Sequence, residues 1–286
     1  MKPADPQLSA VSWTPPRLDD VVAVVTGASR GVGKGIALAL GDAGATVYVT
    51  GRTTVDETAA GVTARGGRGI AARTDHTDDE QVEALFARVR AESGRLDLVV
   101  ANAWGGYEGH DYRTFGAPFW EQPLARWEAM FDAGLRAQLT TAHFAAPLLI
   151  DRGAGALMLT GGWDDLRFYL GNLPYDVSKA GTVRLVAGLA HELRPHGVAA
   201  VGVYPGFTRT EAVVSAFAAE GMEPPEATHS PEYVGRAVVH LFADPELIAL
   251  SGTGAQAATY GERYGFTDVD GRAIEPFAMA EENRLV

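Results

Sequence analysis

The chain contains no cysteine among its 286 residues, which excludes disulfide bonds and thiol chemistry. A protein without disulfides suits the reducing cytoplasm, and we expect that location. The seven histidines are scattered, and none has the spacing of metal ligands such as H-E-x-x-H. We therefore expect no metal site.

Positive charge is also scarce, because 24 lysines and arginines stand against 36 acidic residues and leave a net charge of −12. This balance argues against nucleic acid or an anionic membrane as the main partner. No run of residues is long and apolar enough to span a membrane. Residues 1–20 contain four prolines and lack the apolar centre of a signal peptide, so we expect an extended N-terminal arm.

The remaining residues, 21–286, show no linker or repeat and are 47% hydrophobic over the whole chain, which suits a single domain with a sizeable core. Seven β-rich runs alternate with helical stretches. This alternation predicts an α/β fold with one doubly wound (Rossmann) parallel sheet of about seven strands. The runs are Val21–Thr26, Thr46–Thr50, Gly69–Arg73, Leu96–Ala101, Ala156–Thr160, Val198–Val203 and Thr253–Ala258.

A glycine-rich turn follows the first of these runs. It contains Gly27, Gly31 and Gly33, and the helical stretch Ile36–Leu40 comes next. Glycines at a strand-to-helix turn let a phosphate approach the helix N-terminus closely. The spacing is not the general G-x-G-x-x-G pattern, and a tight turn without any ligand would use similar residues.

Tyr175 and Lys179 are four residues apart in a predicted helix, Pro174–Leu193, so they share one face. A nearby ammonium favours the phenolate and lowers the pKa of a tyrosine, which would make Tyr175 a proton donor or acceptor. Taken alone, the pair is more often a half-buried tyrosine and a solvated lysine on an amphipathic helix.

The order of four motifs along the chain favours a functional role for Tyr175 and Lys179 over that of an ordinary amphipathic helix. The glycine turn is followed by Asn102-Ala103, then by Tyr175-x-x-x-Lys179, then by Pro205-Gly206-x-x-x-Thr210. This pattern resembles the short-chain dehydrogenase/reductase family over about residues 21–259. Residues 264–272 and the tripeptide at 134–136 resemble one subgroup, the dehydrogenase/reductase member 1-like proteins.

The resemblance implies a role for each matching residue. Tyr175 would be the catalytic acid/base, and Lys179 would hold the nicotinamide ribose and support Tyr175. A nicotinamide cofactor would be bound by residues from all four motifs and from the ends of the second and third predicted strands. These residues are Gly27, Ser29, Arg30, Gly31, Val32, Gly33, Arg52, Asp75, Asn102, Tyr175, Lys179, Pro205, Gly206, Thr208 and Thr210.

Two residues depart from the family pattern. The family's catalytic serine lies thirteen residues before the tyrosine, and that position is Gly162 here. The family's asparagine, which helps hold a proton-relay water, is replaced by Gly134. Loss of a hydrogen-bond donor to the substrate oxygen costs orders of magnitude in rate. Thr160 could supply the lost group. The Asp164-Asp165 pair could bind an ammonium or feed a proton relay, although such a pair is more often part of a solvated turn. We expect Gly162→Ser to leave cofactor binding intact and to raise turnover on simple ketones.

Charge indicates the choice of cofactor. An acidic residue at the end of the second strand would bind a ribose 2′-hydroxyl and favour NAD(H). The chain has Arg52 there and Arg30 in the glycine turn, and arginine suits a 2′-phosphate. The sequence therefore favours NADP(H) over NAD(H).

The substrate is expected to be a small carbonyl, alcohol, imine or amine compound. We expect Phe207–Ser230 to form a substrate lid. The resemblance also implies a homodimer or homotetramer, because members of the family commonly associate through two helices. These helices would be Leu124–Ile150 and Pro174–Leu193 here. An alternative is a non-redox isomerase or cyclase, or a cofactor-binding protein, on the same fold. Candidate pocket residues after strand ends are Trp104, Thr160, Gly162, Trp163 and Tyr169.

Overall fold

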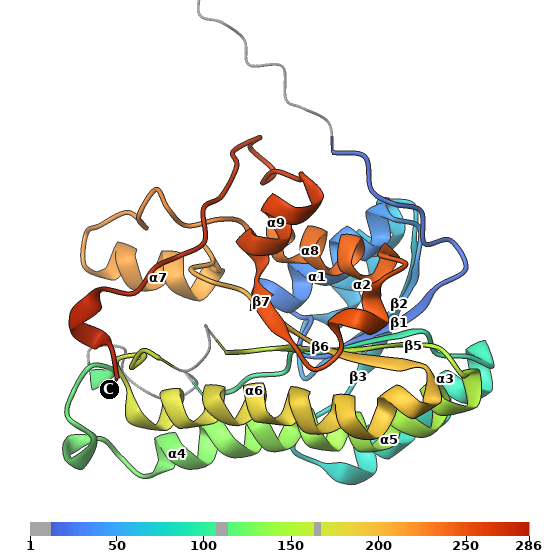
Figure 1. Ribbon diagram of the computed structural model, residues 1–286, viewed down its shortest axis with the longest axis horizontal. Helices are drawn as coiled ribbons and strands as arrows, with labels where there is room; N and C mark the ends of the chain where they lie inside the picture. Colours follow the sequence, from blue (N-terminus) through green and yellow to red (C-terminus); the bar gives the residue numbers. More distant parts are fainter. Residues whose placement is uncertain (1–12, 107–113, 163–166, 286) are drawn as a thin grey trace, which may run out of the picture.

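The computed structural model describes residues 13–106, 114–162 and 167–285 (Figure 1). Trp163, Asp164 and Asp165 lie outside these residues, and so does most of the predicted N-terminal arm. The described part of that arm packs against the rest of the domain. Trp13 Nε1 donates a hydrogen bond to His240 Nε2 at 3.2 Å, and Leu18 is buried.

The predicted α/β fold is confirmed, with seven parallel strands in one sheet of order β3-β2-β1-β4-β5-β6-β7. The winding direction reverses between β1 and β4, and ligands of such sheets bind at the carboxyl ends of the strands beside this point. The strands are β1 Val22–Val25, β2 Thr46–Gly51, β3 Arg68–Arg73, β4 Leu98–Ala101, β5 Gly155–Thr160, β6 Val198–Tyr204 and β7 Gly254–Gln256.

The last strand ends earlier than the sequence predicts. Ala257 and Ala258 begin a helix, which suits their high helix propensity. Gln256 remains extended because its side-chain amide exchanges two hydrogen bonds with the backbone of Phe277, at 2.9 and 2.8 Å.

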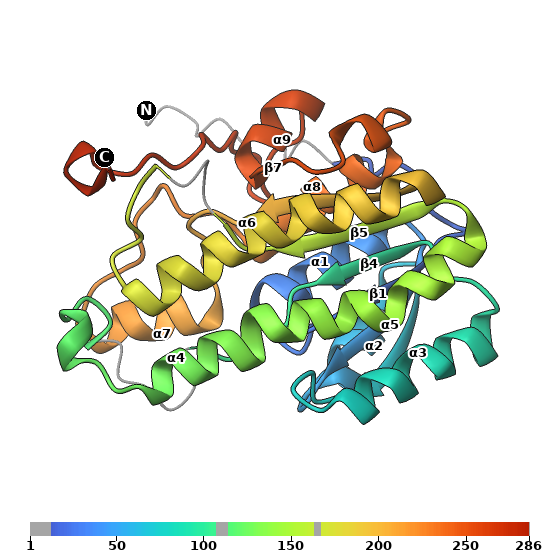
Figure 2. The ribbon, with the colours of Figure 1, turned by 60° about the horizontal axis from the view of Figure 1, so that its bottom comes forward.

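Helices cover both faces of the sheet (Figures 1 and 2). One face carries α1 Gly31–Asp42, α2 Val55–Ala64, α8 Pro231–Ala243 and α9 Ala257–Tyr264. The other carries α3 Asp79–Ser93, α5 Ala137–Arg152 and α6 Leu173–Leu193. The remaining elements are α4 Ala125–Met130, α7 Glu211–Ala219, the π-helical η3 Phe131–Arg136, and the 3₁₀ turns η2 Phe119–Glu121, η4 Arg194–His196, η5 Leu247–Leu250 and η6 Glu281–Asn283.

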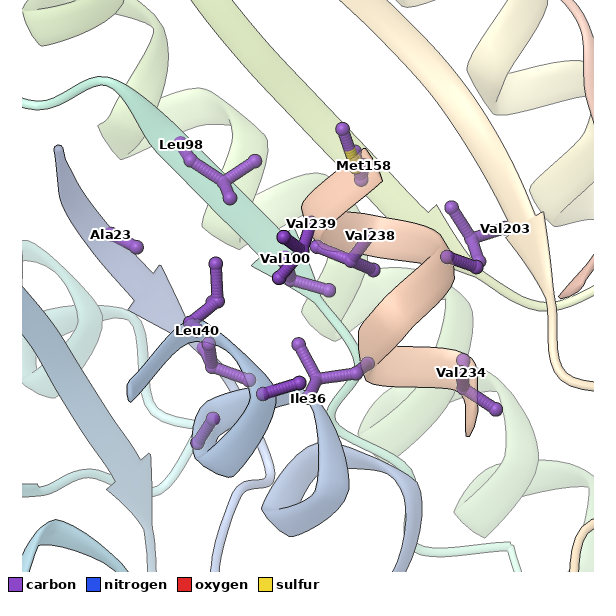
Figure 3. Close-up of a cluster of buried hydrophobic side chains, with 14 of the residues drawn as sticks. Ala23, Ile36, Leu40, Leu98, Val100, Met158, Val203, Val234, Val238 and Val239 are labelled. Atoms are coloured by element: carbon purple, nitrogen blue, oxygen red, sulfur yellow. The ribbon is translucent and has the colours of Figure 1, made fainter. Parts of the chain in front are cut away.

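The core between the sheet, α1 and α8 is made of small and branched apolar side chains. Figure 3 shows Ile36 and Leu40 of α1 facing Val234, Val238 and Val239 of α8, all fully buried. Burying each such side chain contributes roughly 1.5–3 kcal/mol. This packing fixes the N-terminus of α1, and with it the glycine turn, against the sheet.

The predicted helix Leu124–Ile150 has an interruption. Its α4 and α5 segments are joined by η3, in which one wider π-turn replaces regular α-helix. Single π-turns inside helices are often found at functional sites. Here the π-turn contains Gly134, one of the two positions that depart from the family pattern.

Candidate active site

A cleft of about 130 Å³ lies at the point where the winding of the sheet reverses. Its walls come from the glycine turn, from the ends of β2, β3 and β4, and from one residue of η3. The lining residues are Gly27, Ser29, Arg30, Gly51, Arg52, Thr53, Thr74, Asp75, His76, Thr77, Ala103, Trp104, Gly105 and Ala133.

The glycine turn has a shape that side chains would prevent. Gly27 and Gly31 have φ angles of +63° and +54°, which favour glycine. A Cβ on Gly27 would lie 2.8 Å from Ala103 Cα, and a Cβ on Gly33 would overlap the carbonyl oxygen of Gly27. The turn therefore closes tightly against β4 and leaves backbone N–H groups at the start of α1.

One of these N–H groups already binds a negative oxygen. Gly31 N donates to Glu211 Oε2 at 2.9 Å, and Glu211 is the first residue of α7. Thr210, which caps α7, lies 3.4 Å from an ideal Cβ position on Gly31. The start of α1 thus accepts an anion, as a cofactor pyrophosphate requires, and the residues present fit that group.

Tyr175 is placed by the cap of its own helix. The side chain of Asn172 accepts the Tyr175 N–H at 3.0 Å, and its amide donates to Phe115 O and Gln122 Oε1 at 2.8 and 2.6 Å. Asn172 is fully buried, so the first turn of α6 is held firmly. The edge of the Phe115 ring contacts the Tyr175 ring, with 5.6 Å between centroids.

Lys179 lies one turn further along α6 and is 9% exposed. Burial lowers the pKa of its ammonium from 10.5 to about 7. Its Nζ lies 3.6 Å from the centre of the Trp104 ring and 5.3 Å from that of Tyr175. The structure therefore brings Tyr175 and Lys179 together with Trp104, which also lines the cleft.

The geometry at Gly162 argues against the gain expected from a serine there. Gly162 has φ +60°, and an added Cβ would lie 2.6 Å from Tyr204 Cε1. Tyr204 ends β6 and lies over Gly202, whose added Cβ would be 2.6 Å from the same atom. A serine at 162 would be strained and would collide with the ring, so equal spacing along the chain does not restore the family geometry.

Thr160 is a poor substitute for the missing serine. Its Oγ1 donates to Asn102 Oδ1 at 3.1 Å, and the side chain is buried. Asn102 in turn donates to Thr26 O at 3.0 Å and to Gly27 O at 3.3 Å. Both residues thus tie β1, β4 and β5 together beneath the cleft, and neither lines it.

The end of the cleft beside β2 and β3 carries mixed charge. Arg30 and Arg52 line it together with Asp75. Burial raises the pKa of Asp75, but hydrogen bonds from Thr77 N and Oγ1, at 3.0 and 2.8 Å, and the Arg52 charge outweigh it and hold this pKa below its usual range. The sequence predicted all three of these cleft residues, and the two arginines suit a phosphate.

The other predicted residues lie around the cleft rather than in its wall. Pro205 O accepts a hydrogen bond from His229 Nε2 at 2.6 Å. Gly206 has φ +75°, and Thr208 is buried. Val32 packs against the core. Tyr169 precedes α6, where its backbone N–H donates to Asn283 O at 2.8 Å, and Trp163 is outside the described residues.

Several site residues were not predicted from the sequence. Asn172 has the signal of a helix cap, an asparagine two residues before Pro174, but nothing marks its role in placing Tyr175. Glu211 and Tyr204 act through contacts between distant segments. His76 lines the cleft although it is mostly buried. Thr50 Oγ1 lies 2.7 Å from its Nε2, and burial lowers the pKa of its imidazole to about 4.

Comparison with known proteins agrees with this geometry. A sequence model described as short chain dehydrogenase matches residues 21–221. The chain belongs to the short-chain dehydrogenase/reductase family. The mouse protein dehydrogenase/reductase SDR family member 1 is 39% identical over 269 residues, covering 90% of this chain and 85% of the relative. The resemblance to this subgroup is therefore confirmed.

Solved structures of the short-chain dehydrogenase/reductase family share the fold. A hydroxysteroid dehydrogenase from Escherichia coli has a TM-score of 0.71 and 25% identity, over 84% of this chain and 96% of that one. A metagenomic short-chain oxidoreductase in complex with NADP has a TM-score of 0.66 and 28% identity, over 80% and 93% of the two chains. The chain is thus a nicotinamide-dependent oxidoreductase by family. In the described residues, no helix is long and apolar enough to cross a membrane.

Proposed function

We propose that this protein is an NADP(H)-dependent oxidoreductase that interconverts a small carbonyl and alcohol, or an imine and amine, with Tyr175 as the acid/base. The observation that carries this proposal is the placement of Tyr175 and Lys179 on one helix beside a cleft whose glycine turn donates an N–H to the carboxylate of Glu211. When bound, the nicotinamide cofactor supplies or accepts the hydride.

The residues of the chain handle the proton. Tyr175 Oη donates a proton to the carbonyl oxygen in reduction and accepts it from the hydroxyl in oxidation. The Lys179 ammonium, whose Nζ lies 5.3 Å from the centre of the Tyr175 ring, stabilises the negative phenolate that is left. The Asn172 cap keeps the Tyr175 backbone fixed while the proton moves.

The 2′-phosphate specificity is proposed to lie with Arg52 and Arg30. Both arginines line the end of the cleft beside β2, where a carboxylate would bind a 2′-hydroxyl. Arg52→Asp should reduce or reverse a preference for NADPH over NADH in fluorescence titrations. Arg90→Asp, an exposed residue of α3 paired with Asp151, is the matched control. Equal affinity of the natural chain for both cofactors would contradict this assignment.

Tyr175→Phe tests the proposed chemistry, since it deletes one hydroxyl and keeps the ring that packs on Trp104 and Phe115. We expect turnover on a panel of ketones and cyclic imines to fall by about 10²–10⁴-fold. Circular dichroism and NADPH affinity should stay unchanged. Tyr264→Phe, on α9, is the control and should keep full activity. Full activity of Tyr175→Phe would mean that another group moves the proton.

A second candidate is a non-redox isomerase or cyclase that keeps the cofactor site. Gly162 favours it, because this position offers no hydroxyl to a substrate oxygen and its φ of +60° disfavours one. NADPH binding without hydride transfer to any carbonyl or imine, together with isomerisation of a hydroxycarbonyl compound, would favour this candidate.

The surroundings of the site support three further proposals. Residues 207–230 would act as a lid, because α7 buries none of its own residues and contacts the glycine turn through Glu211. Homodimers or homotetramers would form through α5 and α6, where Leu139, Leu173 and Val177 are exposed. We also propose a cytoplasmic location, and neither nucleic acid nor membrane as a partner, from the net charge of −12 and the absence of cysteine.

A further inference from the structure

The space beside Gly134 is filled by an aromatic ring. An added Cβ on Gly134 would lie 2.6 Å from Trp104 Cζ3, and one on Gly106 would lie 2.6 Å from Trp104 Cζ2. Neither glycine has a φ angle that requires glycine. Glycine is therefore needed at both positions only to leave space for the indole of Trp104, which lies between them.

The same indole carries the charge of Lys179. Nζ lies 3.6 Å from the Trp104 ring centre, well within the distance at which an ammonium is attracted to an aromatic face. In the described part of the chain, no carboxylate lies within ion-pair distance of Lys179, and the one titratable group in contact with it is Tyr175 on its own helix. Trp104 also meets the Tyr175 ring edge-on, with 5.7 Å between centroids and 89° between planes.

We propose that Trp104 is a positioning residue that holds the Lys179 ammonium against its ring face, in place of the asparagine-and-water support that Gly134 removes. Tryptophan is the aromatic residue that attracts cations most strongly. The ring gives the largely buried ammonium a favourable contact without any hydrogen-bond acceptor.

This role rests on the proposed oxidoreductase function, because it concerns how the Lys179 ammonium is stabilised beside Tyr175. Its physical consequence can be measured without substrate or cofactor. Desolvation alone lowers the pKa of Lys179, and attraction to the indole opposes that effect. Weakening the ring's negative face, with no change of shape, should therefore lower the pKa of Lys179 further.

Fluorinated tryptophans at position 104 supply that change, because each fluorine withdraws charge from the ring face and adds little volume. The chain has only three lysines, Lys2, Lys34 and Lys179, so ¹³C-lysine labelling gives three side-chain Cε signals to follow by NMR. Lys34→Arg and Lys179→Arg variants assign them. We expect the Lys179 titration midpoint to fall stepwise from monofluoro- to trifluorotryptophan, by about one pH unit in total.

The control uses the same analogues at Trp127, which stacks on Phe131 at 4.0 Å between centroids and is 43% exposed. There the Lys179 midpoint should stay in place. A Lys179 midpoint that does not respond to fluorination at 104, or that responds equally at 127, would overturn the proposal. Failure of the proposed function would appear separately, as full activity of Tyr175→Phe, and would leave this titration unaffected.

Discussion

Gly162→Ser, the change that would restore the family serine, is expected to destabilise the protein. Gly162 has φ +60°, and a residue with a Cβ in this left-handed conformation costs roughly 1–2 kcal/mol. The added Cβ would also lie 2.6 Å from Tyr204 Cε1, and overpacking of this kind costs roughly 1–3 kcal/mol. The expected loss of unfolding free energy is therefore about 2–5 kcal/mol.

The two parts of this loss can be separated in a double-mutant cycle. Tyr204→Ala removes the ring, so Gly162→Ala in that background should lose only the backbone part, about 1–2 kcal/mol. In the natural background Gly162→Ala should lose the full amount. Gly171→Ala is the matched control, because Gly171 also has a positive φ, of +79°, but an added Cβ there has nothing within 4 Å.

Urea unfolding followed by circular dichroism measures these differences, with the unfolding slope m as a check that the unfolded state is unchanged. A loss below about 0.5 kcal/mol for Gly162→Ser would refute the steric reasoning, since no relaxed geometry removes both terms. Equal losses for Gly162→Ala in the natural and Tyr204→Ala backgrounds would show that the ring plays no part.

Three further predictions follow from other contacts. Glu211→Gln should tighten NADPH binding by about 3–10-fold in fluorescence titrations, because it removes a charged competitor from the Gly31 N–H, whereas Glu220→Gln at the end of α7 should change nothing. Because the pKa of Lys179 is lowered in the folded protein, the unfolded chain binds more protons between about pH 7 and 10.5. This group therefore makes the free energy of unfolding rise with pH across that window, by up to about 1.4 kcal/mol per pH unit. Lys179→Met should flatten the pH dependence of the urea midpoint. Asp97→Asn should lower the free energy of unfolding in urea by roughly 2–4 kcal/mol, because the buried carboxylate accepts a hydrogen bond from Val22 N at 2.9 Å and pairs with Arg95 and Arg152. The pKa of Asp97 is lowered, so the stabilisation that its carboxylate gives should be lost below about pH 4. A loss on mutation as large at pH 2 as at pH 7 would contradict the assignment.

The fold could be predicted from the sequence because its signals are local. Each strand is a short apolar run, such as Val22–Val25, followed by a turn and a helix, and short crossovers between parallel strands permit essentially one handedness. The end of β7 was predicted two residues too late, although the high helix propensity of Ala257 and Ala258 is a local signal. The contact that no local pattern contains is the one between Gln256 and Phe277, twenty-one residues away in the chain.

The candidate site could be predicted only where function depends on residue type and spacing. The four-residue interval between Tyr175 and Lys179, and the glycines of the first turn, follow directly from the sequence. The partners of these residues do not. Glu211 reaches Gly31 across 180 positions of the chain, and a lone glutamate at a helix start is ordinary.

The two departures from the family pattern have one physical explanation. Gly134 and Gly162 stand where the family has polar side chains, and at each an aromatic ring from another segment fills the space: Trp104, just after β4, and Tyr204, at the end of β6. Since protein interiors tolerate neither overlap nor voids, each glycine and its ring form one packing unit. The polar groups are thus exchanged for rings rather than simply lost, and a single substitution back to the family residue cannot restore the family arrangement. One of the two rings lies against the Lys179 ammonium, so we propose that the exchange also changes how this charge is held.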